Sequence, residues 1–284
     1  MRFWKSNIFS LGILVIVLLG GCTFRDEVAD RVPVPPGDAE ETSEITRVEN
    51  PKPVIHVLVA LCDNESQGIV PVPAHLGNGD DPDGNLYWGA KYGVEAFFFN
   101  SSRWDRLPDP GIPAEGILRR LAFRHKKTGA YLIADAYRGR RIKAATIDFL
   151  NSAAGNEIRE IELDGRKMQT GGGSDVIVYI GHNGLMDFKV DTPAVPVEGG
   201  TRDAVVLACL SRKYFRQHLK DTGAKPLLLT SNLMAPEAYI LHDALEARLS
   251  GESEKETQLR AAAAYAKYQQ IGQKAAEGLI VTGW

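Results

Sequence analysis

Two side chains capable of covalent catalysis follow hydrophobic runs in this chain of 284 residues. His182 comes directly after VIVYIG, and Cys209 ends the run DAVVLAC a short way further along. An imidazole beside a thiol stabilises the reactive thiolate and can then protonate a departing amine. If the two runs are neighbouring parallel strands, their carboxyl ends lie about 5 Å apart. The pair therefore predicts nucleophilic catalysis by a thiol, against the simpler alternatives of a structural histidine and a buried apolar cysteine.

Short apolar runs and helical stretches alternate along the chain. The runs predict strands covered on both faces, at residues 54–61, 130–137, 175–181, 204–210 and 226–231. The stretches predict helices at residues 112–129, 142–155, 212–223 and 237–251, and an amphipathic helix at residues 256–278. This order is typical of an α/β domain with a mostly parallel sheet flanked by helices, a three-layer sandwich. Sites in such sheets lie beyond the carboxyl ends of the strands.

The two runs together resemble a known pattern. A hydrophobic strand ending in His-Gly, followed by one ending in Ala-Cys, is similar to the caspase-like cysteine peptidases, which include legumain, gingipains, clostripain and separase. This chain has VIVYIGHNG and DAVVLACLS, and its LLLTSNLMAPEAY is similar to the strand and loop after the nucleophile in legumain-like members. The resemblance spans roughly residues 54–250 and implies a caspase-like fold.

The resemblance also implies roles for particular residues. His182 would be the general acid and base, and Cys209 the nucleophile. The backbone N–H groups of Cys209 and of the residue after the histidine would form the oxyanion hole. That residue is Asn183, where the family usually has glycine, and Gly184 comes one place later. Either the turn is rearranged or the hole is imperfect.

Five further residues occupy the positions that shape the substrate pocket in the family. They follow the first and fifth predicted strands, and they are Asp63, Asn64, Glu65, Ser231 and Asn232. Carboxylates at these positions would favour a basic side chain before the cut. Acidic residues on a solvated turn are the alternative interpretation.

The first 22 residues have the pattern of a targeting signal. Arg2 and Lys5 precede an apolar stretch at residues 8–20, which is short for a transmembrane helix. The stretch ends in LGGC, which resembles the lipobox of bacterial lipoproteins and predicts lipidation, including palmitate, on Cys22. A plain secretory peptide or an uncleaved anchor is the alternative. Thr23, in place of Asp, favours the periplasmic face of the outer membrane as the destination in the cell envelope.

Residues 23–52 are rich in Pro, Glu, Asp and Ser and predict a flexible tether before a folded domain at residues 53–284. In an oxidising compartment, Cys62 could form a disulfide with Cys209. The resemblance implies that the first and fourth predicted strands flank the third. Their ends would then be about 9 to 10 Å apart, beyond the usual Cα range of a bridge.

Other functions have little support in the sequence. The formal net charge is −3, and no basic stripe interleaved with aromatic residues points to nucleic acid. The chain has no dinucleotide-binding, Walker, zincin or nucleophile-elbow motif, so no cofactor or metal is expected. The acidic residues around Asp80 fit an Asp- and Gly-rich turn better than a calcium loop. We therefore predict a membrane-anchored cysteine peptidase, or a related amide-bond transferase, acting on a peptide or protein. The alternative is an inactive binding or scaffold lipoprotein.

Overall fold

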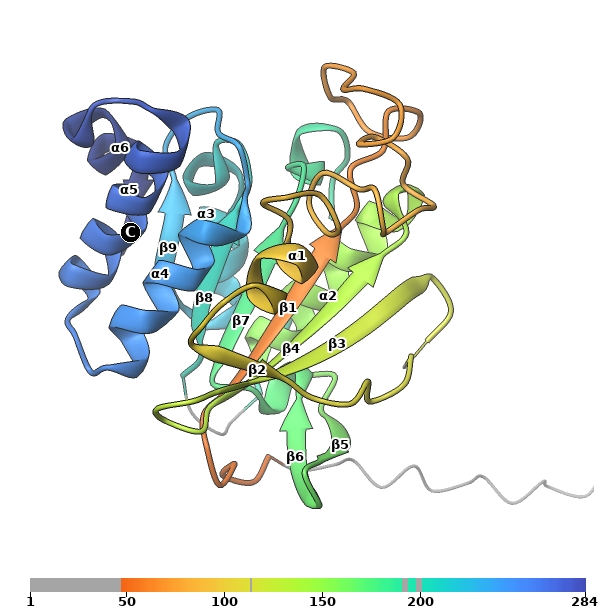
Figure 1. Ribbon diagram of the computed structural model, residues 1–284, viewed down its shortest axis with the longest axis vertical. Helices are drawn as coiled ribbons and strands as arrows, with labels where there is room; N and C mark the ends of the chain where they lie inside the picture. Colours follow the sequence, from red (N-terminus) through yellow and green to blue (C-terminus); the bar gives the residue numbers. More distant parts are fainter. Residues whose placement is uncertain (1–46, 113, 191–193, 198–200) are drawn as a thin grey trace, which may run out of the picture. The chain divides into compact units, whose positions relative to one another are not determined.

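The hydrophobic runs form the centre of one large sheet in the computed structural model (Figure 1). The structure describes residues 47–112, 114–190, 194–197 and 201–284. The chain divides into two units, and Glu44–Trp284 contains every element named below. The predicted signal segment with Cys22, and residues 23–46 of the predicted tether, lie outside the described residues.

Eight strands of the described chain form this sheet, in the spatial order β10-β9-β8-β7-β1-β4-β3-β2. Strands β4, β1, β7, β8 and β9 run parallel, and β2, β3 and β10 are antiparallel to their neighbours. The bounds are β1 (Val54–Ala60), β2 (Trp104–Arg106), β3 (Ile117–His125), β4 (Tyr131–Tyr137), β7 (Val176–Ile180), β8 (Asp203–Leu207), β9 (Lys225–Thr230) and β10 (Ile280–Val281). A separate hairpin consists of β5 (Arg159–Leu163) and β6 (Arg166–Thr170). The predicted mostly parallel α/β architecture is confirmed.

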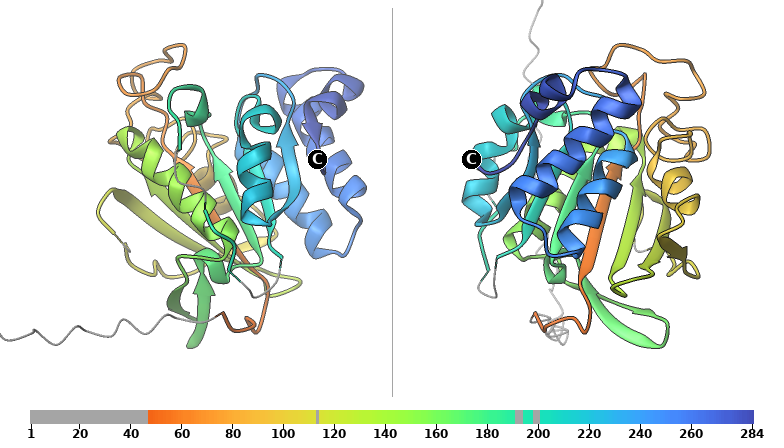
Figure 2. Two further views of the ribbon diagram at one scale, coloured as in Figure 1. Left: turned by 180° about the vertical axis from the view of Figure 1, so that it is seen from behind. Right: turned by 60° about the vertical axis from the view of Figure 1, so that its left-hand side comes forward.

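Helices cover both faces of the sheet, which explains why the central strands lack an alternating polar face (Figure 2). The residues Leu58 and Ala60 of β1 pack in a cluster with α2 and α3, whereas Val57 and Val59 pack in a cluster with α4 and α5. The helices are α1 (Val94–Phe99), α2 (Ile142–Ala154), α3 (Ser211–Thr222), α4 (Ala238–Leu249), α5 (Glu254–Gln269) and α6 (Gln273–Leu279). The order is helix, sheet, helix, as a three-layer sandwich requires. Among the described residues, no helix combines the length and apolar character needed to cross a membrane.

Two predicted helices differ from the structure. Residues 112–129 contain the antiparallel strand β3 rather than a helix. Leu, Ala and Arg favour a helix locally, but Arg120 is buried in the sheet, where its guanidinium binds Asp135 of β4 at 2.6 Å. The predicted C-terminal helix is two helices, because Gln270 takes a left-handed φ of 53° between α5 and α6.

A buried ionic network joins the three strands β3, β4 and β1. Besides the two bonds from Arg120, the Asp135 carboxylate lies 3.0 Å from Nε2 of His56, and all three side chains are buried. Burial alone would raise the pKa of Asp135, but the hydrogen bonds from Arg120 and His56 outweigh it and lower that pKa. His56 Nδ1 accepts the N–H of Gly171 at 3.1 Å, so its Nε2 carries the proton that Asp135 accepts.

Candidate functional site

The loops after β1, β7, β8 and β9 meet at the carboxyl edge of the parallel strands, at the top of Figure 1. Strands β7 and β8 are parallel neighbours, with Ile180 paired to Leu207. His182 and Cys209 each lie two residues beyond that pair. The two residues therefore emerge at matching positions on adjacent strands, and β1 flanks β7 on its other side.

The loop after β7 holds the imidazole in a buried position. Gly181 has a φ of 149°, and a Cβ there would lie 2.8 Å from the carbonyl oxygen of Ala60. His182 is 7 % exposed, and the Tyr179 hydroxyl donates to its carbonyl oxygen at 2.8 Å. The glycine conformation and this anchor set the direction in which His182 leaves the strand.

Asp187, which is not among the site residues predicted from the sequence, is bound to the imidazole. Its Oδ2 lies 2.8 Å from Nε2 of His182 and accepts the N–H of Gly68 at 2.9 Å. An acceptor at Nε2 leaves Nδ1 unprotonated in the neutral ring. Among the described residues, Nδ1 of His182 makes no hydrogen bond. An acidic residue one short turn after the histidine, in HNGLMD, was the available signal.

The nucleophile candidate lies in a tight turn between β8 and α3. Leu210, directly after Cys209, has a left-handed φ of 52°, which is costly for a branched side chain. Ser211 then begins α3, and its Oγ donates to the carbonyl of Val206 at 2.9 Å and accepts the N–H of Thr230 at 2.8 Å. These bonds fix the turn against β8 and β9, with Cys209 partly exposed at its tip.

The structure brings the two loops together without a direct bond between the two side chains. The Cys209 Sγ lies 3.4 Å from both the backbone N and the carbonyl O of Met234. Within the described part of the chain, no hydrogen bond joins this sulfur to His182. In this conformation the imidazole is bound to Asp187 and the thiol to the loop after β9.

Asn183 links the loop that carries the histidine to the loop that carries the cysteine. Its side-chain Nδ2 donates to the carbonyl oxygen of Cys209 at 2.6 Å, and its buried Oδ1 has no hydrogen-bond partner among the residues that the structure describes. Its φ of −78° is accessible to any residue. A Cβ at Gly184 would lie 2.5 Å from the end of the Phe188 ring, so a side chain there requires that ring to move.

Backbone donors are available at this edge. Across the described residues, the N–H groups of Asn183, Gly184 and Cys209 donate no hydrogen bond. Asn183 and Gly184 are buried. Unpaired buried N–H groups are uncommon in proteins, and they are the kind of donor that an oxyanion hole uses.

Cys62 lies at the end of β1, beside the candidate site. Both Cys62 and Cys209 are free thiols in the structure. Burial raises the pKa of Cys62 to about 11, and the Asn85 side chain binds its backbone N and O at 3.0 and 2.8 Å. Tyr87 is close to both thiols, and burial, followed by these neighbours, raises its pKa well above the usual value. A buried thiol with a raised pKa is mostly protonated at neutral pH, so Cys62 is the weaker nucleophile candidate of the two.

The five residues predicted to bind substrate lie at the same edge, but four of them hold loop backbones. Asp63 accepts the Glu65 N–H at 3.0 Å, and the amide of Asn64 binds both N and O of Val72. The Ser231 hydroxyl donates to Gly278 O at 2.6 Å, and Asn232 Oδ1 accepts the next N–H at 2.8 Å. The side chain of Glu65 is exposed and forms no ion pair with any described residue.

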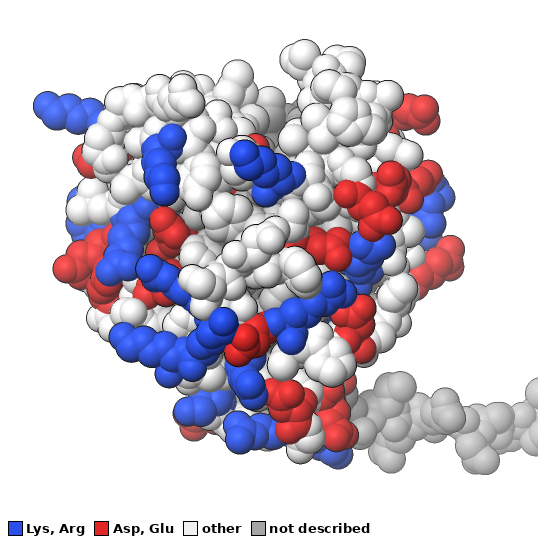
Figure 3. Space-filling view, in the orientation of Figure 1, with Lys and Arg blue, Asp and Glu red and all other residues white. Residues whose placement is uncertain are grey.

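No protein-family model, curated protein or solved structure matches this chain. Among the residues that the structure describes, no group of three or more His, Cys, Asp or Glu side chains could hold a metal ion. On the face seen in Figure 3, Lys and Arg side chains are interspersed with Asp and Glu.

Proposed function

We propose that this protein is a caspase-like cysteine peptidase, or a related amide-bond transferase, that uses Cys209 as nucleophile and His182 as general acid and base. One observation carries the proposal: the two residues emerge at matching positions beyond the paired residues Ile180 and Leu207 of adjacent parallel strands. The unpaired N–H groups beside them and the carboxylate bound to His182 add support.

The chemistry follows from these groups. His182 Nδ1 takes the Cys209 proton, and the thiolate attacks the substrate carbonyl carbon to form a tetrahedral intermediate. The N–H groups of Cys209, Asn183 and Gly184 stabilise its oxyanion. The imidazolium then protonates the leaving amine as the C–N bond breaks, and water hydrolyses the thioester to release the acid and regenerate the thiol. Asp187 stabilises the imidazolium between these steps.

The proposed reaction requires a rearrangement of the Cys209 side chain. Its Sγ must leave the backbone of Met234 and come within about 3 Å of His182 Nδ1 or of a bridging water. Catalytic hydrogen bonds often tighten only when substrate binds. Exposed apolar side chains on three loops at this edge would meet an extended peptide, and they are Val70, Met186 and Leu233.

The proposal also includes attachment to the bacterial cell envelope. Lipid on Cys22 would hold the domain at the periplasmic face of the outer membrane, with residues 23–52 as the tether. The substrate would be a peptide or protein and not nucleic acid. Metabolic labelling with a fatty-acid analogue tests the anchor, and the label should disappear in Cys22→Ala.

Thiol labelling and peptide cleavage test the catalytic pair together. An electrophilic peptide probe should attach to Cys209, and His182→Ala should slow this at least tenfold. Cys209→Ala should abolish cleavage of a fluorogenic peptide library, whereas Cys62→Ala, as the matched control, should retain it. Equal labelling of Cys209 in the wild type and in His182→Ala would contradict the proposed pair.

An inactive binding or scaffold lipoprotein is the second candidate. Two contacts favour it. The Cys209 thiol is bonded to the backbone of Met234 and not to His182, and the Asn183 side chain connects the loops after β7 and β8. In that case the wild-type domain would cleave no library peptide, and Cys209→Ala would leave its binding to any partner unchanged.

A further inference from the structure

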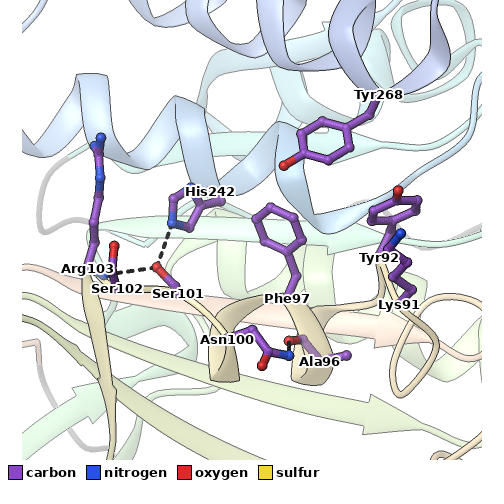
Figure 4. A pocket seen from close by; sticks show the side chains of 10 residues that line it. All are labelled: Lys91, Tyr92, Ala96, Phe97, Asn100, Ser101, Ser102, Arg103, His242 and Tyr268. Atoms are coloured by element: carbon purple, nitrogen blue, oxygen red, sulfur yellow. Dashed lines mark hydrogen bonds between the residues drawn. The ribbon is translucent and has the colours of Figure 1, made fainter.

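A second group of chemically competent side chains lines a cavity built from other elements. The cavity has a volume of about 520 Å³ and lies between α1, the segment after α1, α4 and α5 (Figure 4). This volume is in the range of small-molecule sites. Its wall is aromatic, from Tyr92, Phe97 and Tyr268, and its polar groups gather at one end around Ser101 and His242.

Ser101, His242 and Asp243 form a continuous hydrogen-bonded chain at that end. Ser101 Oγ lies 2.9 Å from Nε2 of His242, and Nδ1 of the same ring lies 2.8 Å from Oδ1 of Asp243. A carboxylate at Nδ1 holds the neutral imidazole with its proton on Nδ1. Nε2 is then the acceptor for the Ser101 hydroxyl.

The surroundings keep this imidazole in one orientation. His242 is 8 % exposed and lies edge-on to the rings of Phe97 and Phe98, with centroid distances of 5.4 and 5.6 Å. Ser101 is half-buried in the cavity wall. A solvent-reachable hydroxyl bonded to a fixed, carboxylate-supported histidine is the arrangement that activates serine nucleophiles.

We infer that Ser101 is an acylatable nucleophile in a second, esterase-type site, with His242 as its general base and Asp243 as the residue that positions His242. The Ser101 oxygen attacks the carbonyl carbon of an ester while His242 takes its proton. The bond from carbon to the alcohol oxygen breaks, and His242 gives the proton to the departing alcohol. Water then cleaves the acyl-serine to carboxylic acid and free Ser101.

A donor for the oxyanion is present next to the nucleophile. In the described chain, the N–H of Ser102 donates no hydrogen bond. The N–H of the residue after a nucleophilic serine is a common oxyanion donor. The N–H of Arg103 donates to Ser101 Oγ at 3.1 Å, which helps fix the oxygen.

The cavity lining indicates the substrate class. Phe97, Tyr268 and Tyr92 extend from Ser101 toward Lys91 at the opposite end (Figure 4). Lys91 forms no ion pair within the described residues, whereas Arg103 is bound to Glu246 at 2.6 Å. An aromatic ester with a negatively charged group on its far side would match the aromatic wall and the Lys91 ammonium.

The test uses the full-length protein with its thiols blocked by iodoacetamide, so that cysteine chemistry cannot contribute. A fluorophosphonate probe followed by peptide mass spectrometry should give an adduct on Ser101. A probe adduct at other residues only, or no adduct at all, would overturn the inference. This test uses the wild-type protein alone, so it does not depend on the folding of any variant.

Ester hydrolysis provides a second readout. Ser101→Ala should reduce turnover of a 4-nitrophenyl ester at least 100-fold, whereas Ser250→Ala, an exposed serine that follows α4, should retain it. Asp243→Asn should lower kcat more than it raises KM. Lys91→Met should reduce the preference for 4-acetoxybenzoate, whose carboxylate lies on the far side of the ring, over the uncharged phenyl acetate. Turnover by Ser101→Ala within twofold of wild type would refute the site. Failure of the peptidase proposal would appear separately, as absence of Cys209-dependent peptide cleavage.

Discussion

Replacement of Asp187 by asparagine isolates the charge that supports His182. The same oxygen, Oδ2, accepts both from Gly68 N–H at 2.9 Å and from His182 Nε2 at 2.8 Å. Asparagine can present its single amide oxygen at that point, so both bonds keep their geometry and only the charge is lost. Alanine removes both bonds. The two variants therefore form an ordered series.

The size of each effect follows from the hydrogen bond to the imidazole. A bond to a charged group contributes about 1.5–3 kcal/mol, and a neutral bond about 0.5–1.5 kcal/mol. The loss of charge in Asp187→Asn should therefore cost about 1–1.5 kcal/mol of transition-state stabilisation, or about 5- to 13-fold in rate. Asp187→Ala should lower the rate about 10- to 150-fold. The effect should lie toward the lower end of this range, because 32 % of the Asp187 side chain is exposed and solvent screens its charge.

Two measurements check this series. The first is the rate of Cys209 alkylation at neutral pH, which needs no substrate, and the second is kcat/KM for any peptide that the wild type cleaves. Asp221→Asn and Asp221→Ala are matched controls, because Asp221 is an exposed carboxylate on α3 and, among the described residues, its side chain binds only Gln217. Rates within twofold of wild type for both Asp187 variants would refute the proposed role of this carboxylate.

Three further predictions concern buried groups. At pH 8 the Cys62 thiol should be alkylated about 100-fold more slowly than an ordinary cysteine, because its pKa is about 11. The same raised pKa should leave the free energy of unfolding unchanged below pH 9 and lower it by roughly 2 to 3 kcal/mol as the pH rises from 9 through 11. Urea titrations should show this decline in the wild type and not in Cys62→Ala. Asp135→Asn should lower the free energy of unfolding by about 3–5 kcal/mol, because it leaves Arg120 buried without its ionic partner. In the wild type, the contribution of ionised Asp135 to the free energy of unfolding should be lost as the pH falls through its lowered pKa. An acid titration followed by far-UV circular dichroism would measure this loss. Gly181→Ala should cost about 1–3 kcal/mol in urea titrations, whereas Gly278→Ala should not lower stability, because that exposed glycine lies in α6 and a Cβ there meets no atom within 4 Å.

The parallel core was predictable because its strands are buried on both faces. All five predicted strands contain or overlap a strand of the structure, as residues 54–61 contain β1 and residues 175–181 contain β7. Continuous apolar runs of this length have few other stable positions in an α/β protein.

The antiparallel edge was not predictable by the same means. In β3, the strong helix formers and the charge of Arg120 suggested a surface helix, and only the partner Asp135 on β4 explains why the arginine is buried. The hairpin of β5 and β6 carries charged side chains and lies outside the main sheet. Both cases are hairpins between strands adjacent in the sequence, and the Asp164-Gly165 turn between β5 and β6 is a hairpin signal that the sequence contains. These strands carry charged side chains and lack the continuous apolar run that marks the parallel core.

The candidate site was predictable to the level of strand ends. The rule that parallel strands present their carboxyl ends together brought His182 and Cys209 to one edge, and the register of β7 and β8 agrees. The directions of the two side chains depend on the φ of 149° at Gly181 and of 52° at Leu210. These backbone conformations depend on the packing of Gly181 against Ala60 and on the hydrogen bonds of Ser211 at the start of α3. The sequence alone therefore could not show that His182 binds Asp187 and that Cys209 binds Met234.

Asn183 decides how the departure from the family pattern should be understood. The position after the histidine requires glycine only if its backbone is left-handed or if a Cβ there would be obstructed. Asn183 has a φ of −78°, which any residue can adopt. Its backbone N–H donates to no group in the described part of the chain, as the proposed oxyanion donor requires, while its side chain donates to the carbonyl of Cys209 at 2.6 Å. Asparagine at this position therefore leaves its N–H available to the proposed oxyanion hole, and its side chain connects the loops after β7 and β8.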